Sequence, residues 1–456
     1  MVLNLLKTLI DYSLFEKYDK DYFLKNKIVP LYEDSITLSL AVCSKSNLQG
    51  VKSDFVKILN FVEVDELDIL FILSNLTRNL NLYNFAKNSL SNSALEQHTA
   101  NFLDELILYS IEQRASDIHI EKYKNLVLFK FRVDGRLKIF FSFNEEFFKV
   151  FSSFVKLISN LDITQNRVAL DGRFSRFINE KKYDFRLSTM PTINAESIVL
   201  RVLDNKNIDK NLENLGLSLN LYENIKSCLR LTQGLILISG PTGSGKTTTL
   251  YAMLKELNSD DKKIITVEDP IEYKIDSINQ VQINNKVGLS FEVVLKNILR
   301  QDPDIIFIGE IRDSFSLEVA LQASLTGHLV LASIHAANSL ETITRVLDLK
   351  DDSFLISTTL KAVIAQRLVL TYCKECEAKG CKKCNFTRFY GRTQIAELLK
   401  VDEKISSLIF KKASISEFKE YLKSVDFKTI LDDGKLKVEQ NITNLEEILK
   451  VVNFSD

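Results

Sequence analysis

The sequence predicts a multidomain α/β protein, and three observations predict this class. The chain has 456 residues, which is too long for one hydrophobic core, so two to four domains are expected. In the second half, short apolar runs that end in acidic residues alternate with helical patterns, which is typical of a parallel sheet. The preceding segment switches between helical and period-two patterns, which favours an α+β domain. The formal net charge is only −1, so no global basic field indicates a nucleic-acid partner.

The first 90 residues predict a small α/β module. Strand-like runs at 36–42 and 61–64 alternate with helical runs at 54–59 and 67–76, and the polar stretch 81–93 predicts a linker. No apolar run approaches the length of a membrane span, and the N-terminus lacks the basic and small-residue features of a signal peptide. A cytoplasmic protein is therefore expected.

The next hundred residues predict an α+β domain with arginine-rich strands. Helical patterns cover 99–113 and 147–161, and Asp134-Gly135 joins two strand patterns as a hairpin turn. A solvated strand face explains most charges of this kind, and His119 alone is more often packed or capping than a ligand. Further strands are expected at 117–121, 172–178, 183–190 and 197–203, and the strand arginines are Arg132, Arg136, Arg173, Arg186 and Arg201.

A glycine-rich stretch, SGPTGSGKTT, lies between an apolar strand pattern and a helical pattern. It satisfies G-x-x-x-x-G-K-[ST], and the strand-turn-helix context disfavours a chance glycine-rich turn. Glycines reach backbone conformations closed to other residues, and consecutive N–H groups at a helix N-terminus bind phosphate oxygens. Lys246 would neutralise the β- and γ-phosphates, and Thr247 would bind Mg²⁺. We interpret this P-loop as an ATP site formed by Gly240, Pro241, Thr242, Gly243, Ser244, Gly245, Lys246, Thr247 and Thr248.

Three further apolar strand patterns, at 264–267, 305–308 and 329–333, are followed or flanked by polar residues. A carboxylate at the C-terminal end of a strand can orient or deprotonate attacking water, or hold Mg²⁺ through water. One such pattern is weak evidence, but three that follow a P-loop are strong evidence. The candidates are Glu268, Asp269 and Glu272 after the first strand, Glu310 after the second in a Walker B pattern, and His328 and His335 around the third.

Four cysteines, Cys373, Cys376, Cys381 and Cys384, form C-x2-C-x4-C-x2-C. Two such turns can close a tetrahedral thiolate site, which suits structural Zn²⁺ in a reducing compartment. Neighbouring lysines would offset the charge of minus two that four thiolates and one Zn²⁺ leave. An iron–sulfur cluster and a redox dithiol are the alternatives.

From residue 402 onward the pattern predicts a helical bundle. Two capping boxes are expected, the first from Ser414 to Glu417 and the second from Thr443 to Glu446. Apolar residues follow both boxes at helical spacing, so both helices should bury one face.

In this order, the motifs resemble those of the GspE/PilB family of secretion ATPases, which power type II secretion, type IV pilus assembly and DNA uptake. The resemblance extends from about residue 115 to the C-terminus, and residues 24–80 are similar to the family's adaptor domain. It implies an adaptor domain at 1–90, an arginine-bearing, PAS-like α+β domain at 91–212, and a RecA-like ATPase domain at 213–456 with a zinc module at 371–392 and a C-terminal helical part. The matching segments are GPTGSGKTTTLY, ITVEDPIEY, LRQDPDIIFIGEIRD, TGHLVLASIHAANS, AQRL and a tetracysteine followed by GRTQIAELL.

The resemblance also implies a homo-hexamer that hydrolyses ATP in a cleft between the arginine-bearing domain and the ATPase domain. Platform and assembly proteins would recruit it to the inner membrane. The implied residue roles are water activation for Glu272, ahead of Glu268, within an Asp box that includes Asp269; γ-phosphate sensing for His328 and His335 of a His box; and phosphate contact for Arg186, Arg201 and Arg300.

Three features depart from the family pattern. Ala195-Glu196-Ser197 stands where Gly-Glu-Arg is usual, which removes one arginine. Lys296 occupies a position often held by arginine, which puts a bidentate phosphate contact there in doubt. The cysteine pairs are closer together than in most relatives.

A motor ATPase for pilin or pseudopilin assembly is the leading hypothesis. A pilus-retraction ATPase is the first alternative, although those motors typically lack the adaptor domain and the tetracysteine insertion. A nucleic-acid translocase or zinc-bearing nucleic-acid module is the second; the neutral charge and the lack of an aromatic-studded basic stripe disfavour nucleic acid as a direct ligand. The full set of carboxylates disfavours a nucleotide-sensing scaffold without turnover.

Overall fold

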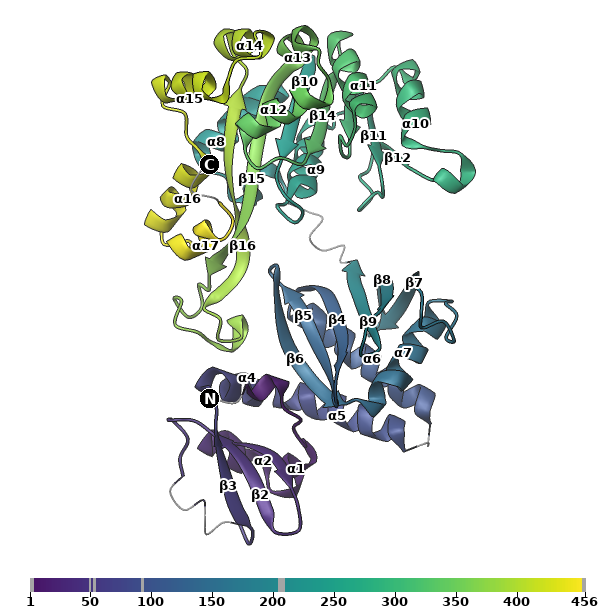
Figure 1. Ribbon diagram of the computed structural model, residues 1–456, viewed down its shortest axis with the longest axis vertical. Coiled ribbons are helices and arrows are strands. Elements are labelled where there is room, and N and C mark those ends of the chain that lie inside the picture. Colours follow the sequence, from purple (N-terminus) through teal and green to yellow (C-terminus); the bar gives the residue numbers. More distant parts are fainter. Residues whose placement is uncertain (1–3, 49–50, 52–54, 92–93, 204–209, 453–456) are drawn as a thin grey trace. The chain divides into compact units, whose positions relative to one another are not determined.

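The chain divides into two compact units in the computed structural model, which describes residues 4–48, 51, 55–91, 94–203 and 210–452. Unit 1 comprises Met1–Asp204 together with Cys373–Tyr390, and unit 2 comprises Asn205–Tyr372 and Gly391–Asp456 (Figure 1). The tetracysteine segment is therefore inserted in the sequence of unit 2 but belongs to unit 1. None of the described helices is both long enough and apolar enough to cross a membrane.

Unit 1 contains a three-stranded sheet in the order β1-β2-β3 and a six-stranded sheet in the order β6-β5-β4-β9-β8-β7. Its elements are η1 (Leu5–Lys7), α1 (Ser13–Lys17), α2 (Lys20–Asn26), β1 (Val29–Glu33), β2 (Thr37–Val42), β3 (Ile58–Glu63), α4 (Glu66–Ser74), α5 (Leu76–Leu90), α6 (Leu95–Glu112), β4 (Ala115–Tyr123), β5 (Leu126–Val133), β6 (Arg136–Asn144), α7 (Glu146–Ile158), β7 (Leu170–Ile178), β8 (Lys181–Pro191), β9 (Glu196–Leu203) and η6 (Lys382–Cys384).

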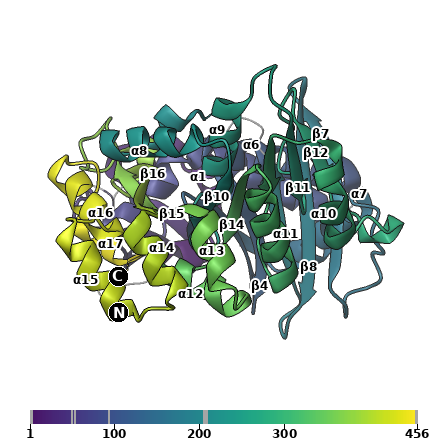
Figure 2. The same ribbon diagram turned by 90° about the horizontal axis from the view of Figure 1, so that it is seen from above.

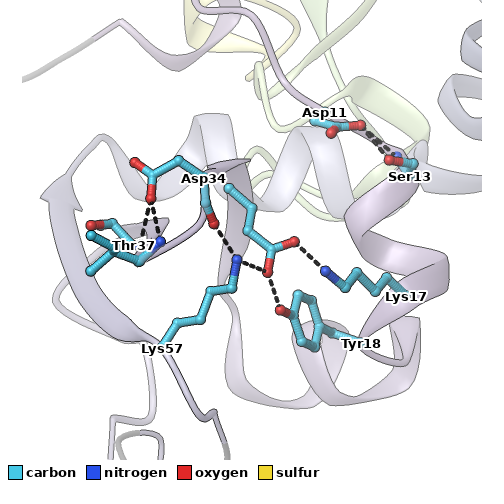
Figure 3. Close-up of polar contacts among 9 residues, drawn as sticks. Asp11, Ser13, Lys17, Tyr18, Asp34, Thr37 and Lys57 are labelled. Carbon is cyan, nitrogen blue, oxygen red and sulfur yellow. Dashed lines mark hydrogen bonds and ion pairs between the residues drawn. The ribbon is translucent and has the colours of Figure 1, made fainter.

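A charged cluster at Glu33 holds the small sheet to helix α1. Lys17 Nζ lies 2.5 Å and Lys57 Nζ 2.7 Å from the Glu33 carboxylate, and the Tyr18 hydroxyl also donates to it (Figure 3). Burial acts to raise the pKa of Glu33, but these three donors outweigh it and lower the pKa to about 2. The cluster joins α1, β1 and the residue before β3.

Two predictions for this region are wrong. Of the helix expected at 54–59, residue 54 lies outside the described residues and residues 55–57 are not helical. Strand β3 begins at Ile58 and pairs in parallel with β2, and its β-branched and aromatic residues suit a sheet. The stretch 81–93 is not mainly a linker, since most of it is helix α5; Leu82 and Ala86 are fully buried on one face, a stripe that the Asn-rich composition conceals. The strand expected at 36–42 and the helices expected at 99–113 and 147–161 are confirmed.

Helices α6 and α7 cover the apolar face of the six-stranded sheet. Phe102 on α6 packs against Phe129 on β5 and Phe147 on α7, with ring centroids 5.2 and 4.6 Å apart. Side chains alternate between the faces of a strand, so Ile118 and Ile120 on β4 enter this core while His119 between them lies on the opposite, polar face.

The tetracysteine segment packs on the same unit. Phe386 joins the hydrophobic core of unit 1, and the Asn385 side chain donates to Gln113 Oε1 at 2.5 Å. Lys138 on β6 donates to the Asn385 carbonyl at 3.2 Å and lies 3.8 Å from the ring centroid of Phe71 on α4. Burial lowers the pKa of Lys138 to about 8. One side chain thus connects α4, the six-stranded sheet and the tetracysteine segment.

Unit 2 is built on a seven-stranded sheet in the order β12-β11-β13-β14-β10-β15-β16, and neighbouring strands from β12 to β15 run parallel. Its elements are η3 (Leu212–Leu215), α8 (Leu219–Leu229), β10 (Gly234–Ser239), α9 (Lys246–Leu257), β11 (Ile264–Glu268), β12 (Asn279–Gln282), η4 (Asn285–Val287), α10 (Phe291–Ile298), η5 (Leu299–Gln301), β13 (Ile305–Ile308), α11 (Ser314–Leu325), β14 (Leu329–Ile334), α12 (Ser339–Leu349), α13 (Ser353–Thr359), β15 (Leu360–Tyr372), β16 (Phe389–Lys400), α14 (Glu403–Phe410), α15 (Ile415–Ser424), α16 (Ile430–Glu439) and α17 (Leu445–Leu449).

Helices cover both faces of this sheet, which explains why its strands are continuous apolar runs. Figure 2 shows helices α8 and α9 on one face of the sheet and helices α12 to α14 on the other. On β10, Leu235 and Leu237 enter the core that contains α10 to α14, whereas Ile236 and Ile238 enter the core that contains α8 and α9. The sheet is therefore buried on both sides, and its strand ends are the places where polar groups can gather.

The C-terminal helices are confirmed, with one shifted cap. Ser414 and Glu417 form the expected capping box of α15. At the next box the N-cap is Asn444, whose side chain accepts from the Glu447 N–H at 2.9 Å, and not Thr443. Asparagine caps at least as well as threonine, and the neighbouring residue therefore takes the role.

Candidate nucleotide site

The parallel strands of unit 2 bring the expected chemical groups to one edge of the sheet. Ser239, the last residue of β10, pairs with Ile334 on β14 and with Ala365 on β15, and Val267 on β11 pairs with Ile308 on β13. Residues one or two positions after these share the edge with the P-loop. They are Glu268, Glu310, His335 and Gln366. This edge is where open α/β sheets bind ligands.

The P-loop has the backbone of an anion cradle. Gly240, Gly243 and Gly245 have φ values of 150°, 79° and 90°, which other residues rarely adopt. A Cβ atom on Gly240 would lie 2.5 Å from Ser244 Oγ and 2.6 Å from the Gln366 carbonyl oxygen, so no side chain fits there. Helix α9 begins directly after the loop, and its first N–H groups lack intrahelical partners.

Lys246 lies back over the loop that it follows. Its ammonium donates to the Gly240 carbonyl at 2.7 Å and to the Pro241 carbonyl at 3.2 Å. Burial lowers the pKa of Lys246, and the nearby Glu310 carboxylate opposes this shift. A phosphate in the loop would compete with the two carbonyl groups for the ammonium.

Glu310 links the Walker B strand to the His box. Its Oε1 lies 2.9 Å from His335 Nε2, and its Oε2 accepts from Arg312 Nε at 2.7 Å. The Glu310 carboxylate raises the pKa of Arg312. Carboxylate and hydroxyl oxygens suit Mg²⁺, and Thr247 in the first turn of α9 offers the hydroxyl.

Glu268 is buried and its carboxylate is occupied by protein donors. Its Oε1 accepts from Thr266 Oγ1 at 2.6 Å and Gln280 Nε2 at 3.3 Å, and its Oε2 accepts from the Tyr251 hydroxyl. Burial raises the pKa of Glu268. These contacts fit a structural carboxylate that fixes the end of β11, and they leave it poorly placed to act on water. The exposed members of the Asp box are Asp269 and Glu272.

His328 and Arg300 lie at the opposite edge of the sheet. His328 precedes β14, and its carbonyl accepts from the N–H of Gly234 at the start of β10. The length of β14 separates it from His335 by roughly 20 Å. Arg300 adjoins Gln301, whose carbonyl accepts from Lys263 Nζ just before β11. Within one subunit, both residues therefore lie away from the P-loop end of the strands, which argues against a phosphate contact by either of them there. A motif shows which residues accompany a strand but not which end of the strand a ligand occupies.

Four of the five predicted strand arginines of unit 1 form a cross-strand row on its six-stranded sheet, whereas Arg136 pairs with Val133 outside the row. Arg173 on β7 pairs with Arg186 on β8, and Arg186 pairs with Arg201 on β9. Arg201 pairs with Asp117 on β4, which in turn pairs with Arg132 on β5. Arg201 Nε donates to Asp117 at 2.9 Å, whereas Arg132 Nε lies 3.9 Å away. Asp117 is the carboxylate within this row.

The row has more positive charge than its own carboxylate can balance. Like charges directly opposite each other destabilise a sheet, so the arrangement favours a bound anion. Arg186 Nε is buried and has no hydrogen-bond partner among the described residues, which leaves a donor unused. We call Arg173, Arg186, Arg201 and Arg132, with Asp117, the arginine row.

Two of the segments that depart from the family pattern contain residues with local structural roles. Glu196 is buried beside Lys156 at 2.5 Å and accepts from Ser152 at 3.0 Å, so it belongs to the core of unit 1. Lys296 pairs with Glu292 on the exposed face of α10.

The four cysteines meet in unit 1. Cys373 and Cys381 Sγ atoms are 3.9 Å apart, Cys376 and Cys384 are 3.9 Å apart, and Cys381 and Cys384 are 3.8 Å apart. A tetrahedral ion with bonds of about 2.3 Å to sulfur requires sulfur separations of about 3.8 Å. The Gly380 N–H also donates to Cys376 Sγ at 3.3 Å. The cluster could hold one metal ion, and the short central spacing does not prevent it.

The sequence analysis missed three buried polar residues on β15 and β16. Gln366, Gln394 and Glu397 are at most 4% exposed. Glu397 accepts from the Ser339 N–H at 2.7 Å at the start of α12 and from the Ile430 N–H at 3.0 Å at the start of α16. The available signal was a polar residue inside an apolar strand, since such a residue must find a partner when buried.

Comparison with known proteins places these features in a family. Residues 93–450 match the family model described as "Type II/IV secretion system protein". The chain belongs to this family. It is 41% identical over 371 residues to "Type II secretion system ATPase E" of Vibrio cholerae, with 76% of this chain and 74% of the relative covered. It is 38% identical to "Type II secretion system protein HxcR" of Pseudomonas aeruginosa, with 76% of each chain covered. The resemblance to secretion ATPases is therefore confirmed.

Two solved structures share the fold. The pilus retraction motor PilT with bound ADP is 26% identical, with a TM-score of 0.56 over 77% of this chain and 96% of that chain. The Legionella pneumophila ATPase DotB is 23% identical, with a TM-score of 0.61 over 77% of this chain and 95% of that chain. The chain is thus an α/β ATP hydrolase of the secretion ATPase family.

The opposite placement of the two histidines gives a direct test. His335→Ala should lower the kcat of ATP hydrolysis by about a hundredfold, because it removes the polar group that holds Glu310 at the phosphate edge. His328→Ala should leave kcat unchanged. Phosphate release measures both, with thermal melting to confirm that both variants fold. Equal losses in the two variants would contradict the assignment of the site to one edge.

Proposed function

We propose that this chain is a cytoplasmic ATPase motor that powers pilin or pseudopilin assembly in a type II secretion, type IV pilus or DNA-uptake system. The observation that carries the proposal is the gathering of the glycine cradle, Lys246 and the Glu310–His335 pair at one sheet edge. The names of the relatives at 41% and 38% identity support secretion as the process served. Inner-membrane platform and assembly proteins would recruit the motor to its site of action.

The residues of the P-loop fit a nucleotide. Loop N–H groups would bind the phosphates, and Lys246 would leave its two carbonyl partners to neutralise them. Thr247 and Glu310 would hold Mg²⁺, which supplies charge neutralisation when bound. Glu272 is exposed after β11 and has a carboxylate available for the attacking water, whereas the oxygens of Glu268 are occupied.

The arginine row supports a second set of phosphate contacts. We propose that Arg186 and Arg201 in unit 1 contact a nucleotide held by unit 2, of the same or a neighbouring subunit of a homo-hexamer. Each charge-assisted contact contributes about 1.5–3 kcal/mol, which favours the closed arrangement by roughly ten- to a hundredfold. ATP binding would then be converted into movement of a PAS-like unit against a RecA-like one.

The four cysteines are proposed to hold one structural Zn²⁺. Their sulfur separations match the edges of a tetrahedral thiolate site. The binding energy of such a site contributes to folding, so the ion would stabilise the segment that packs on unit 1.

Retraction of a pilus is the second candidate, since the retraction motor PilT shares the fold. Its identity of 26% is well below that of the secretion relatives. The tetracysteine segment and the N-terminal three-stranded sheet also favour the assembly motor. We do not propose nucleic acid as a direct ligand, because the formal net charge is −1.

Two variants separate nucleotide binding from hydrolysis. Lys246→Ala should abolish turnover and weaken binding, because the cation that faces the phosphates is lost. Glu310→Gln should bind nucleotide normally and lose hydrolysis, since the cradle is untouched. Calorimetric titration and phosphate release provide the two measurements. Wild-type turnover in Glu310→Gln would remove Glu310 from the mechanism.

The arginine row has a matched control on its own sheet. Arg201→Ala and Arg186→Ala should each lower hydrolysis by roughly tenfold or more, because each removes a charge-assisted phosphate contact. Arg176 on β7 pairs with Asp104 at 2.8 Å outside the row, and Arg176→Ala should keep normal turnover. Solution scattering should show that nucleotide makes the control variant more compact, and that this compaction is smaller in the two row variants. Normal turnover and compaction in both row variants would refute the two-unit site.

The metal assignment predicts one Zn²⁺ per chain in protein purified without added metal. Elemental analysis tests it, and iron or an absence of metal refutes it. Replacing Cys373 and Cys376 with serine should remove the ion and lower the melting temperature, because ligand loss removes folding energy. Cys43→Ser, at an isolated buried cysteine, controls for loss of a buried thiol and should keep the ion.

A further inference from the structure

The P-loop is in contact with two buried glutamines from β15 and β16. Gln366 Nε2 donates to the Ser244 carbonyl of the loop at 2.9 Å. Gln394 Nε2 donates to Gln366 Oε1 at 2.9 Å, and Thr249 Oγ1 on α9 donates to Gln394 Oε1 at 3.3 Å. Gln366 is fully buried and Gln394 is 2% exposed, so solvent does not compete for these groups. We call Gln366 and Gln394 the glutamine relay.

The hydrogen bonds of the glutamine relay can run in only one donor-to-acceptor direction. A peptide carbonyl accepts but cannot donate, so Gln366 must present its NH₂ group to Ser244. Its oxygen then faces Gln394, which must also present its NH₂ group. The remaining oxygen of Gln394 faces the Thr249 hydroxyl, which can donate. Every amide orientation therefore follows from the first acceptor.

Holding the Ser244 carbonyl also sets the direction of the next N–H. The peptide unit between Ser244 and Gly245 is planar and trans, so its C=O and N–H groups point to opposite sides. When Gln366 binds the carbonyl, the Gly245 N–H points away from Gln366. We propose that Gln366, oriented by Gln394, is a positioning residue that directs the Gly245 N–H toward the phosphate. This inference rests on the nucleotide site proposed above.

The loop needs such a contact because of its own glycines. Gly245 has φ of 90°, and a glycine backbone can rotate its neighbouring peptide at little steric cost. A flipped Ser244–Gly245 peptide would present a carbonyl oxygen to the phosphates in place of a donor. The bond from Gln366 opposes this flip, since a flipped peptide would leave a buried amide without its acceptor. Gln366 also packs closely against the loop, since a Cβ atom on Gly245 would lie only 3.3 Å from Gln366 Nε2.

Substitutions in the relay test the inference by titration with Mg-ADP and by steady-state ATP hydrolysis. Gln366→Met keeps the volume but removes the donor, and the Kd for Mg-ADP should rise roughly tenfold. Because the cradle contacts the ground state and the transition state alike, KM should rise with it while kcat at saturating ATP stays near the wild-type value. Ser324→Ala, a buried hydroxyl deletion on α11 away from the P-loop, is the control and should change neither.

A second pair of variants acts without touching the P-loop. Gln394→Glu places a carboxylate against Gln366 Oε1, which should turn the Gln366 amide round and present its oxygen to the Ser244 carbonyl. Gln394→Met lacks that repulsion, so the Kd for Mg-ADP should rise less than in Gln394→Glu, although glutamate is closer to glutamine in shape. Melting temperatures show which variants fold. If Gln366→Met fails to fold, a larger rise in Kd for Gln394→Glu than for Gln394→Met still supports the positioning role of Gln366.

The outcomes distinguish the inference from the nucleotide site on which it rests. Normal Mg-ADP binding by Lys246→Ala would overturn the site itself. Loss of binding in Lys246→Ala, together with relay variants that bind like Ser324→Ala, would overturn the relay alone. A fall in kcat with unchanged Kd, or equal effects of glutamate and methionine at position 394, would also overturn it.

Discussion

The parallel register of β10 with β14 and β15 is the constraint on which the site depends. It places His335 and Gln366 beside the loop that follows Ser239, and the register of β13 with β14 adds Glu310. A shift of one residue would exchange the two faces of a strand and move every following side chain. Close packing of helices against the side chains on both faces opposes such a shift, so the helices around the sheet position the chemistry although they contribute few of its groups.

Buried polar contacts on β15 and β16 connect parts of this edge that the strand register alone only brings near. Arg367 donates to the Gln366 carbonyl at 2.9 Å and to the Ala337 carbonyl of the His box at 2.6 Å. Glu397 fixes the helix that begins just after the His box, at Ser339. In a water-free interior such bonds are strong, and an unmade one is costly. The P-loop and the His box are therefore held by a common set of side chains.

Local signals in the sequence were sufficient for the strand-turn-helix of the P-loop, the strand ends and most of the helices. They were insufficient where the role of a residue depended on contacts with residues far away in the sequence. The sequence around Glu268 predicts a catalytic carboxylate, but Tyr251 and Gln280 both donate hydrogen bonds to its oxygens. His328 and His335 flank β14 and differ in which end of the strand they adjoin. The buried glutamines stand in quoted motifs, yet their roles depend on Ser244, which is 122 residues before Gln366 in the chain.

The tetracysteine segment has a consequence for how the chain is synthesised. Residues 1–204 leave the ribosome early, but the segment that covers Gln113, Arg114 and Lys138 is made only after most of unit 2. Domains generally fold as units during synthesis. Until the tetracysteine segment is made, unit 1 therefore lacks part of its structure and these side chains stay uncovered. A shortened gene that ends at residue 204 would produce this incomplete form permanently. One that begins at residue 213 would leave Phe386 without the core that it joins.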